Sequence, residues 1–345
     1  MNATKQEMCL FLEVIRVGNP SAAIKTTAIV TSVIHVFTAT AALCGNGLML
    51  YIFWHFKGLQ TASNLLLASL CITDLLTGMI VQPLSIARRI IEAWGEHNCI
   101  VRAVCAYNAF LCIDASIQIV AIVSIDRWIA IKMPFRYPHI GKVERYLKVV
   151  AFTWLVWVVF TMMPFIDVFT ASHFFIGITV SISINIFVVL VCYAQIFAVV
   201  LKHRKRISQQ YPQQKIKCVD NKQNNTNTIA IVIFVMLVSY LPLLPLFIIR
   251  GTMGDSESIV FILDAWADVF VYANSSVNPF IYWYRSREIR RSIHAVLRRW
   301  RILPAPRNLT SSRRTAPASI YSVSLQMRKI SPIRILPNRT PSYKS

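Results

Sequence analysis

Long apolar runs recur along the chain and are separated by short polar segments that hold most of the charged residues. Each run has about twenty residues or more, the length that an α-helix needs to cross the roughly 30 Å apolar core of a bilayer. The pattern predicts seven membrane-spanning helices, over residues 27–54, 64–89, 101–131, 147–166, 173–201, 229–249 and 259–284. We therefore expect an all-α membrane protein, with a seven-transmembrane helix bundle in residues 27–284.

The two ends of the chain differ from this bundle and from each other. Residues 1–26 precede the first apolar run and form an N-terminal segment. Residues 285–300 place Ile289 and Ile293 at helical spacing among arginines, which predicts an amphipathic helix on the membrane surface. Residues 301–345 are rich in Pro, Ser, Thr and Arg and show little apolar periodicity, so we expect a disordered cytoplasmic tail.

The distribution of basic residues predicts how the bundle is oriented. The chain has 36 Lys and Arg against 15 Asp and Glu, a net charge of +21. Of the 36 basic residues, 29 fall on one side of the predicted helices, in the segments 55–63, 126–148, 202–222 and 285–345. By the positive-inside rule these segments are cytoplasmic and the N-terminus is extracellular. Because an anionic inner leaflet accounts for this charge, we expect membrane lipid and no nucleic acid as a partner.

Polar side chains follow one face of the last predicted helix and recur in the second and third. At about 100° per residue, the last helix aligns Asp264, Asp268, Val271, Ser275, Asn278 and Tyr282. Lipid cannot satisfy such groups, so these faces should look into the bundle. At one depth they bring together Asp74, Ser116, Asn274 and Asn278. A carboxylate with neutral oxygens suits a hard cation such as Na⁺; a hydrogen-bonded cluster that only joins helices is the alternative.

Asp114 falls on a different face of the third predicted helix. It precedes Arg127 by thirteen residues, which places it about 140° from the interior face that Arg127 marks. We expect it to point toward the fourth and fifth helices and to pair with a side chain such as Ser183 or Asn185 there, since a buried carboxylate needs a partner. The alternative is that Asp114 contacts the ligand.

Charged residues also gather where the predicted bundle opens to the outside. Asp264 and Asp268 lie opposite Arg88 and Arg89. We assign Arg88, Asp264, Asp268 and Tyr272 to a candidate ligand pocket, in which mixed charge suits a peptide or a zwitterionic small molecule. The alternative is that the charged groups pair with one another and touch no ligand.

Two further features concern the outer side. Asn2 begins an Asn-X-Thr glycosylation acceptor in the N-terminal segment. Most of the eight cysteines lie inside apolar runs as small buried hydrophobes, and the predicted outer disulfide joins Cys9 to Cys99. No Cys or His spacing is typical of a bound transition metal, so we expect no resident cofactor beyond the sodium ion.

Taken together, these residues resemble the rhodopsin-like (class A) G-protein-coupled receptors over residues 27–300. The resemblance is carried by motifs in a fixed order, namely Gly45-Asn46, Leu70 through Asp74, Ser116, Asp126-Arg127, Trp154, Tyr193, Pro242, and Asn278 through Tyr282. It implies a multi-pass receptor of the plasma membrane. It also implies an extracellular ligand and a heterotrimeric G protein as partners, with arrestin and receptor kinases acting on the same inner surface.

The resemblance also implies roles for single residues. Asp74, Ser116, Asn274 and Asn278 would form the sodium pocket. The activation and G-protein coupling residues would be Asp126, Arg127, Tyr193, Tyr240, Pro242, Pro279 and Tyr282, which would rearrange to open a cytoplasmic cleft. Proline removes a backbone hydrogen bond and kinks a helix, which gives the sixth helix a point on which to swing.

The chain departs from the family pattern in several places. Trp128 follows the Asp-Arg pair in place of Tyr, Tyr240 stands in place of the usual Trp, and Asn185 stands in place of the fifth-helix proline. The short second outer loop has no cysteine, so the family's common outer disulfide cannot form. These two features, together with Asn185, are similar to the melanocortin, cannabinoid and adenosine-like branch. Amine-binding members carry an Asp where this chain has Ala109, which does not favour a biogenic amine.

Two other function classes are less compatible with the chain. A seven-helix channel or transporter would need charges that continue along one conduit, and Asp126-Arg127 would have no purpose there. An enzyme would need a nucleophile with its base or a metal cluster, and the seven His residues are dispersed without such spacing. We therefore expect a receptor and no enzyme activity, with the channel or transporter as the alternative.

Overall fold

Six long apolar helices dominate the computed structural model, which describes residues 8–9, 12–13, 20–96, 98–163, 171–210, 235, 238–242 and 257–300. By length and composition each of the six could cross a membrane. The predicted sixth helix, 229–249, lies outside the described residues except at 235 and 238–242. The predicted glycosylation site at Asn2 and the tail 301–345 also lie outside them.

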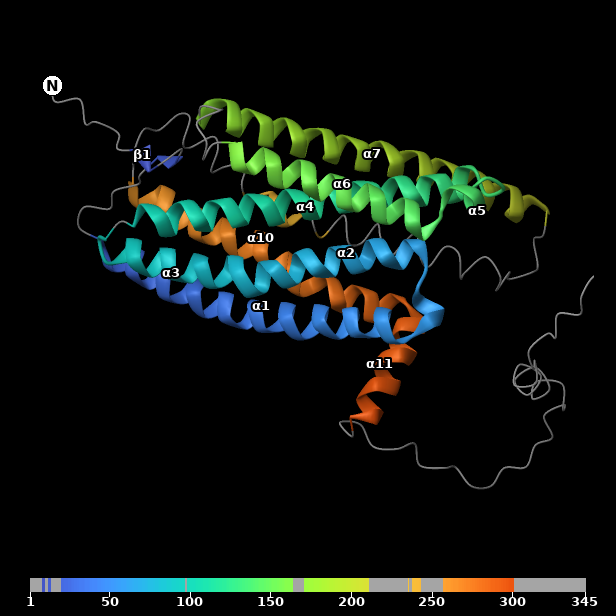
Figure 1. Ribbon diagram of the computed structural model, residues 1–345, viewed down its shortest axis with the longest axis horizontal. Coiled ribbons are helices and arrows are strands. Elements are labelled where there is room, and N and C mark those ends of the chain that lie inside the picture. Colours follow the sequence, from blue (N-terminus) through green and yellow to red (C-terminus); the bar gives the residue numbers. More distant parts are fainter. Residues whose placement is uncertain are drawn as a thin grey trace, which may run out of the picture. The chain divides into compact units, whose positions relative to one another are not determined.

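The helices of the bundle follow the predicted spans closely (Figure 1). They are α1 (Ala22–His55), α2 (Ala62–Leu76) continued by the π-turn η2 (Thr77–Val81) and α3 (Gln82–Ala93), α4 (Cys99–Lys132), α6 (Val143–Met162), α7 (Ala171–Gln210) and α10 (Glu257–Arg285). The amphipathic helix is α11 (Arg287–Arg299). Short elements complete the described part: η1 (Lys57–Leu59), α5 (Tyr137–Ile140) and a hairpin of β1 (Met8–Cys9) and β2 (Leu12–Glu13), paired antiparallel.

Side-chain caps decide where several helices begin. The Ser21 hydroxyl accepts a hydrogen bond from the Ile24 backbone N–H, so α1 starts five residues before the predicted position 27. Thr61, Asn98 and Ser286 cap α2, α4 and α11 in the same way. These residues lie outside the apolar runs, which is why hydrophobicity alone placed the boundaries a few residues off.

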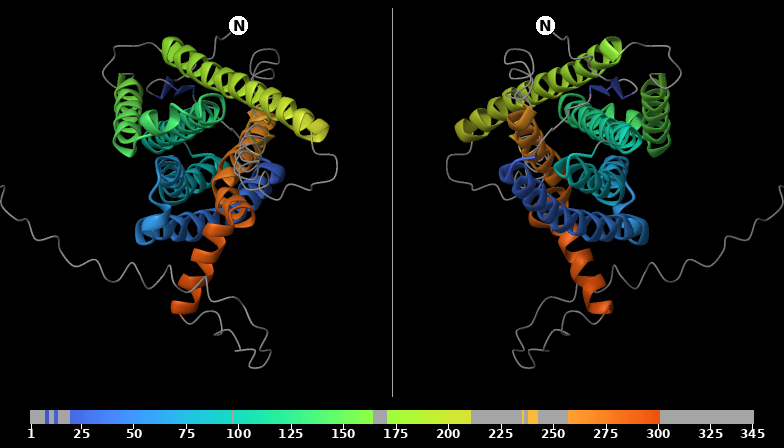
Figure 2. Two further views of the ribbon diagram at one scale, coloured as in Figure 1. Left: turned by 90° about the vertical axis from the view of Figure 1, so that its right-hand side faces the viewer. Right: turned by 90° about the vertical axis from the view of Figure 1, so that its left-hand side faces the viewer.

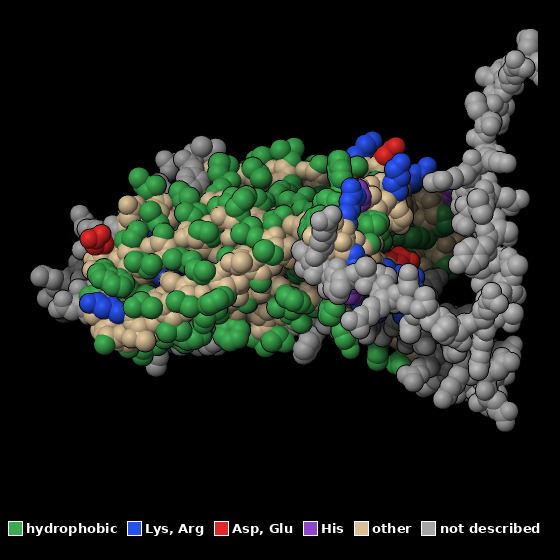
Figure 3. Space-filling model, turned by 90° about the horizontal axis from the view of Figure 1, so that it is seen from below, with side chains coloured by type: hydrophobic (Ala, Val, Ile, Leu, Met, Phe, Trp, Pro, Cys, Tyr) green, Lys and Arg blue, Asp and Glu red, His purple; other side chains and the backbone are tan. Residues whose placement is uncertain are grey.

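Within residues 1–302, which form one unit, α1 lies against α10, α3 and α2, and α4 lies against α7 (Figures 1 and 2). Small residues allow these close approaches: a Cβ added at Gly78 of η2 would lie 3.2 Å from the Ala39 carbonyl oxygen of α1. The outward faces are apolar, and green side chains cover the middle of the face seen in Figure 3. Phe37, Phe152 and Phe187 are each more than 60% exposed, as expected of side chains that face lipid.

The π-turn η2 changes which side chains of α3 face the interior. It follows Asp74 within one turn and contains one more residue per turn than an α-helix. The face of α3 therefore advances by about 100° relative to the regular helix used to predict it. As a result Arg89 is the more deeply buried of the two arginines, with 1% of its side chain exposed against 13% for Arg88.

Candidate functional site

Pro279 lies inside α10, and the neighbouring α1 compensates for its missing N–H. In a regular helix the N–H of residue 279 would bond to the carbonyl of Ser275. Instead, Asn46 Nδ2 donates to that carbonyl oxygen at 2.9 Å. Gly45 makes room for the proline ring, since a Cβ there would lie 2.8 Å from Pro279 Cγ. Gly45 thus leaves space for the proline ring, and Asn46 supplies the hydrogen bond that α10 lacks at this turn.

The mid-membrane cluster predicted from the sequence forms around Asp74. Asn278 Nδ2 donates to Asp74 Oδ2 at 2.9 Å, and both side chains are 1% exposed. On the α4 side, the Ser116 hydroxyl donates to Thr73 Oγ1 and lies 2.9 Å from it. Thr73 was missed in the sequence, although its place beside Asp74 puts it at the same depth.

Several oxygens of this cluster have no hydrogen-bond donor among the residues that the structure describes. They are Asp74 Oδ1, Asn278 Oδ1, Asn274 Oδ1 and Asn46 Oδ1, all buried. A buried acceptor without a donor is costly, and a hard cation would satisfy a carboxylate and several amide oxygens at once. The residues present therefore fit a sodium ion, although among the described residues no group of three His, Cys, Asp or Glu could hold a metal ion.

Near the C-terminal end of α4, the Asp126 carboxylate contacts three side chains. Its Oδ1 accepts from the phenols of Tyr137, at 3.0 Å, and Tyr146, at 2.6 Å. Its Oδ2 lies 2.8 Å from Arg127 Nη2, yet that ion pair is not aligned as a hydrogen bond. Burial and the Asp126 carboxylate raise the pKa of Tyr137, so the phenol stays a donor. Neither tyrosine was predicted, because each comes from a later segment that no spacing relates to Asp126.

Arg127 and two tyrosines at this end retain unused hydrogen-bonding capacity. Arg127 Nε, the Tyr193 hydroxyl and the Tyr282 hydroxyl are buried and have no hydrogen-bond partner among the described residues. Tyr193 lies within electrostatic range of Arg127. These three side chains are among those expected to rearrange, and in the described part of the chain the named atoms remain available for new hydrogen bonds.

Trp128, which follows the Asp-Arg pair, joins α4 to α7. Its Nε1 donates to Gln195 Oε1 at 2.8 Å, and Lys132 Nζ donates to the same oxygen at 3.1 Å. The Lys132 ammonium also lies 4.9 Å from the Trp128 ring centroid, within the range of a cation–π interaction. The Trp128 indole therefore makes two contacts: its ring N–H donates to Gln195, and the face of its ring contacts the Lys132 ammonium.

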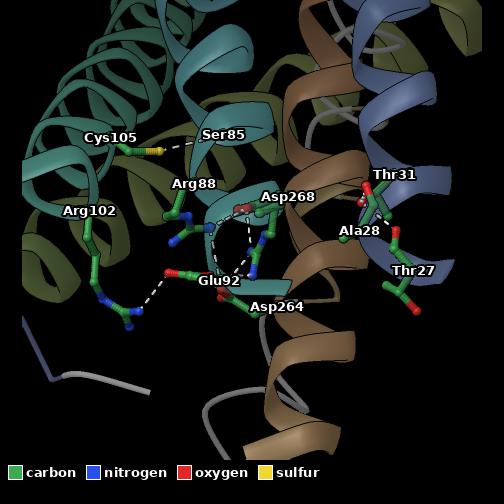
Figure 4. A network of polar contacts seen from close by, with 11 residues as sticks. Thr27, Ala28, Thr31, Ser85, Arg88, Glu92, Arg102, Cys105, Asp264 and Asp268 are labelled. Carbon is green, nitrogen blue, oxygen red and sulfur yellow. Dashed lines mark hydrogen bonds and ion pairs between the residues drawn. The ribbon is translucent and has the colours of Figure 1, made fainter. Parts of the chain in front are cut away.

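At the outer end, six charged side chains form one network (Figure 4). Arg89 Nη2 lies 2.6 Å from an oxygen of both Asp264 and Asp268, and Arg88 Nη2 lies 2.7 Å from Asp268. Glu92 extends the network to Arg102, 2.8 Å away on α4. Three arginines and three acids balance, so the network neutralises itself and joins α3, α4 and α10. The charged groups predicted at the mouth of the bundle are thus paired with one another, and their contact with a ligand stays a prediction.

Next to this network, α1 contributes a polar side chain without partners. His35 is 1% exposed, and neither ring nitrogen has a hydrogen-bond partner among the described residues. Its ring lies 5.7 Å, centroid to centroid, from that of Tyr272. Below them Ala109 packs with Val81, Cys112, Val271 and Tyr272, so the position of the amine-binding Asp is apolar here.

The remaining predicted residues are partly described. Tyr240 packs against Ala109 and its neighbours as a half-buried side chain, and Pro242 lies in a turn that follows it. Asp114 does face α7, but its partners are Ser181 and Gln118. The expectation of Ser183 was wrong, since that hydroxyl bonds to the Thr179 carbonyl of its own helix.

Among the described residues, the free cysteines Cys71, Cys105, Cys112 and Cys192 are buried. Cys44 is also free, but it is exposed on α1, so the expectation of a buried side chain was wrong there. Cys99 is disulfide-bonded, and β1, which contains Cys9, contacts α4. The pairing of Cys9 with Cys99 stays a prediction.

Comparison with known proteins finds trace amine-associated receptors among the relatives of this chain. Trace amine-associated receptor 7d of Mus musculus is 25% identical over 298 residues, which cover 76% of this chain and 80% of that receptor. Trace amine-associated receptor 8b of Rattus norvegicus is 25% identical over 294 residues, covering 76% and 84%. These relatives do not support a place near the melanocortin, cannabinoid and adenosine receptors.

Residues 45–282, more than half of the chain, match the family model described as 7 transmembrane receptor (rhodopsin family). The match does not favour a channel or transporter, and it implies a receptor rather than an enzyme. Its range includes the predicted sixth span and so completes the seven helices of the bundle. The chain belongs to the rhodopsin family of seven-transmembrane, G-protein-coupled receptors.

Proposed function

We propose that this receptor activates a heterotrimeric G protein when helices around Arg127 separate and open a cleft at the cytoplasmic end. The observation that carries the proposal is the state of Arg127, whose guanidinium is partly buried yet poorly aligned with Asp126, its ion-pair partner among the described residues. Tyr193 and Tyr282 offer unused hydroxyls at the same end. An open conformation that pairs these groups would gain hydrogen bonds that the described conformation lacks.

Nucleotide exchange on purified G proteins tests this. Ligand-free receptor should accelerate GTPγS binding by at least one G-protein class, and Arg127→Ala should reduce that acceleration about tenfold or more, since a charged hydrogen bond is worth about 1.5–3 kcal/mol. Arg291→Ala, on the exposed face of α11, serves as the matched control and should change the rate less than about twofold. Exchange by the Arg127 variant at the rate of the unmodified receptor would contradict the proposal.

We also propose that a sodium ion occupies the cluster around Asp74, Ser116, Asn274 and Asn278. Asp74, Asn274 and Asn278 support it, since each has a buried oxygen that receives no hydrogen bond from the described residues. Sodium at a concentration of roughly ten times its Kd would stabilise the receptor by about 1.4 kcal/mol. This corresponds to a rise in Tm of roughly 2–4 °C.

The test compares unfolding of the purified receptor in sodium chloride and in choline chloride at equal ionic strength. The receptor should unfold at a higher temperature in sodium chloride. Asp74→Asn keeps the size of the side chain and its acceptor for Asn278, but it should abolish the difference between the salts. Asp114→Asn removes the other mid-membrane acid and should leave the difference intact. A sodium effect that survives in the Asp74 variant would exclude this site.

On the outer side, we propose that the extracellular ligand contacts the network of Arg88, Asp264 and Asp268 together with Tyr272. A peptide or zwitterionic ligand would exchange its own charges for those of the network. The relatives are named for trace amines, yet Ala109 here offers no carboxylate. An ammonium group would therefore have to take Asp268 from the two arginines that hold it.

The orientation of the receptor is part of the same proposal. The basic loops and the C-terminus would face the cytoplasm and the N-terminus the exterior, where Asn2 would be glycosylated and Cys9 would pair with Cys99. Arrestin and receptor kinases would then meet the same inner surface as the G protein.

A further inference from the structure

Asp114 places a buried carboxylate at the contact between α4 and α7. Its side chain is 1% exposed. The Ser181 hydroxyl lies 3.1 Å from Oδ1 and 3.3 Å from Oδ2, and the Gln118 amide donates to Oδ2. A carboxylate can accept about four hydrogen bonds, and each of these two neutral side chains gives it one hydrogen. Asp114 therefore keeps capacity for further donors. We name Asp114, Gln118 and Ser181 the α4–α7 site.

The charge of Asp114 is not balanced within the described part of the chain. The ion pairs formed there use the acids Glu92, Asp126, Asp264 and Asp268. Asp114 is in none of these pairs, and neither is Asp74, which belongs to the mid-membrane cluster. A carboxylate that is buried away from water is costly without a counter-charge. A cation at the α4–α7 site would supply that counter-charge.

The orientation of Ser181 also favours this site. Ser183, two residues further along α7, donates its hydroxyl to the Thr179 carbonyl of its own helix. Ser181 instead directs its hydroxyl across to α4. Asn185 Nδ2 donates to the Ser181 carbonyl oxygen at 2.9 Å and lies 3.5 Å from Ser181 Oγ. Because Asn185 takes the acceptor side of that hydroxyl, its hydrogen is left for the carboxylate. The residue that replaces the fifth-helix proline thus helps to build the site.

Aromatic side chains lie one turn of α4 before the carboxylate. Phe110 precedes Asp114 by four residues, so it lies on the same face of α4 and about 6 Å nearer the N-terminal end. The ring of Phe174, on α7, meets the Phe110 ring edge-on, with centroids 5.8 Å apart and planes 77° apart. Phe160 of α6 stacks on Phe174 with centroids 5.7 Å apart. An aromatic surface therefore adjoins the α4–α7 site.

We propose that the α4–α7 site binds the ammonium group of a primary amine that carries an aromatic ring. The ammonium brings three donors and the positive charge that Asp114 lacks. A chain of two carbons spans about one turn of helix, so it places the ring against Phe110. Gln118 is half-buried and turns away to release Oδ2. The inference rests on the proposed function only in that the ligand enters from the outer side.

This site differs from the two other places where an amine could be held. Ala109, at the position of the amine-binding Asp, packs with Val81 and Tyr272. Asp114 is five residues further along α4, which rotates it by about 140° and moves it about 7.5 Å deeper. Asp268 already contacts two arginines. An ammonium gains a counter-charge at Asp114 without displacing a cation.

The test compares two probes of the same shape by their effect on thermal unfolding of the full-length receptor in a non-ionic detergent. Phenethylamine carries an ammonium group at neutral pH, and phenethyl alcohol carries a hydroxyl in its place. The rise in Tm during a titration gives the apparent Kd of each probe. The amine should bind about tenfold more tightly than the alcohol. Asp114→Asn should remove that difference, because a charged hydrogen bond becomes a neutral one.

Further variants control for structural effects of this change. Asp114→Glu keeps the charge and should keep the preference for the amine, which separates loss of charge from misfolding. Ser181→Ala should weaken amine binding about threefold. Ser183→Ala is its matched control on the same helix and should change either Kd less than about twofold, since its hydroxyl bonds within α7.

Three results would overturn the proposal. They are equal Kd values for the two probes in the unmodified receptor, no rise in Tm with the amine, and a preference for the amine that survives in the Asp114→Asn variant. If that preference were lost in Asp268→Asn instead, the ammonium would bind in the outer network. No G protein is present in this assay. Binding with the expected pattern but without nucleotide exchange would therefore contradict the proposed function alone.

Discussion

Replacing Arg89 by alanine is expected to destabilise the receptor by about 3–5 kcal/mol, the cost of removing one partner from a buried ion pair. The Arg89 side chain is 1% exposed and lies 2.6 Å from both Asp264 and Asp268. Its guanidinium also lies 5.2 Å from the Phe261 ring centroid. Without it, two carboxylates share Arg88, which is 3.5 Å from one of them. Thermal unfolding of the purified receptor measures the loss.

A second substitution should recover most of this loss. Arg89→Ala with Asp264→Asn restores the charge balance, so the double variant should be more stable than Arg89→Ala alone. Arg88→Ala is the matched control: its side chain is 13% exposed and water replaces part of its role, so we expect a loss of about 1–2 kcal/mol. If Arg89→Ala unfolds at the temperature of the unmodified receptor, the network does not hold α3 to α10.

The sequence placed these charged groups together, but it could not predict which of the two arginines is the more deeply buried. A regular helix places Arg88 on the interior face of the second span. The π-turn η2 shifts that face by one residue, and nothing in Thr77–Val81 predicts a π-turn. Arg89 therefore reaches the acids from a direction that regular helical geometry does not give.

Other parts of the site were predictable because they depend on one helical face. Asp74 and Asn278 come from separate helices at matching depth, and their 2.9 Å contact follows from the polar stripes. Contacts that depend on the rotamer of a side chain, or that come from a segment with no regular spacing to the site, could not be predicted. Asp114 faces α7 as expected, yet Ser181 and not Ser183 points back at it, because two residues on a helix differ by about 200°. The six described membrane spans were predicted well because bilayer thickness sets their length, whereas caps such as Ser21 set their ends.

Asn46→Ala is expected to cost about 2–3 kcal/mol, because it leaves the Ser275 carbonyl buried without a donor. Asn46 is fully buried, and its amide lies 2.9 Å from the Ser275 oxygen and 3.0 Å from the Ala42 oxygen. The second of these carbonyls keeps its own helical partner, so most of the loss arises in α10. Thermal unfolding of the purified receptor again gives the change.

A double-mutant cycle with Pro279→Ala tests whether Asn46 replaces the missing helical hydrogen bond. Alanine at 279 supplies the N–H that proline lacks, and that N–H can bond to the Ser275 carbonyl within α10. Asn46→Ala should therefore cost less in the Pro279→Ala background than in the unmodified receptor, with a coupling energy of about 1–2 kcal/mol between the two positions. Asn46→Ala with Ser276→Ala, whose hydroxyl bonds to Ala273 on its own helix, should instead show additive losses. Additivity of the Asn46 and Pro279 variants would mean that the Asn46 amide does not replace the missing helical bond, and the Gly45-Asn46 motif would then need another physical reason.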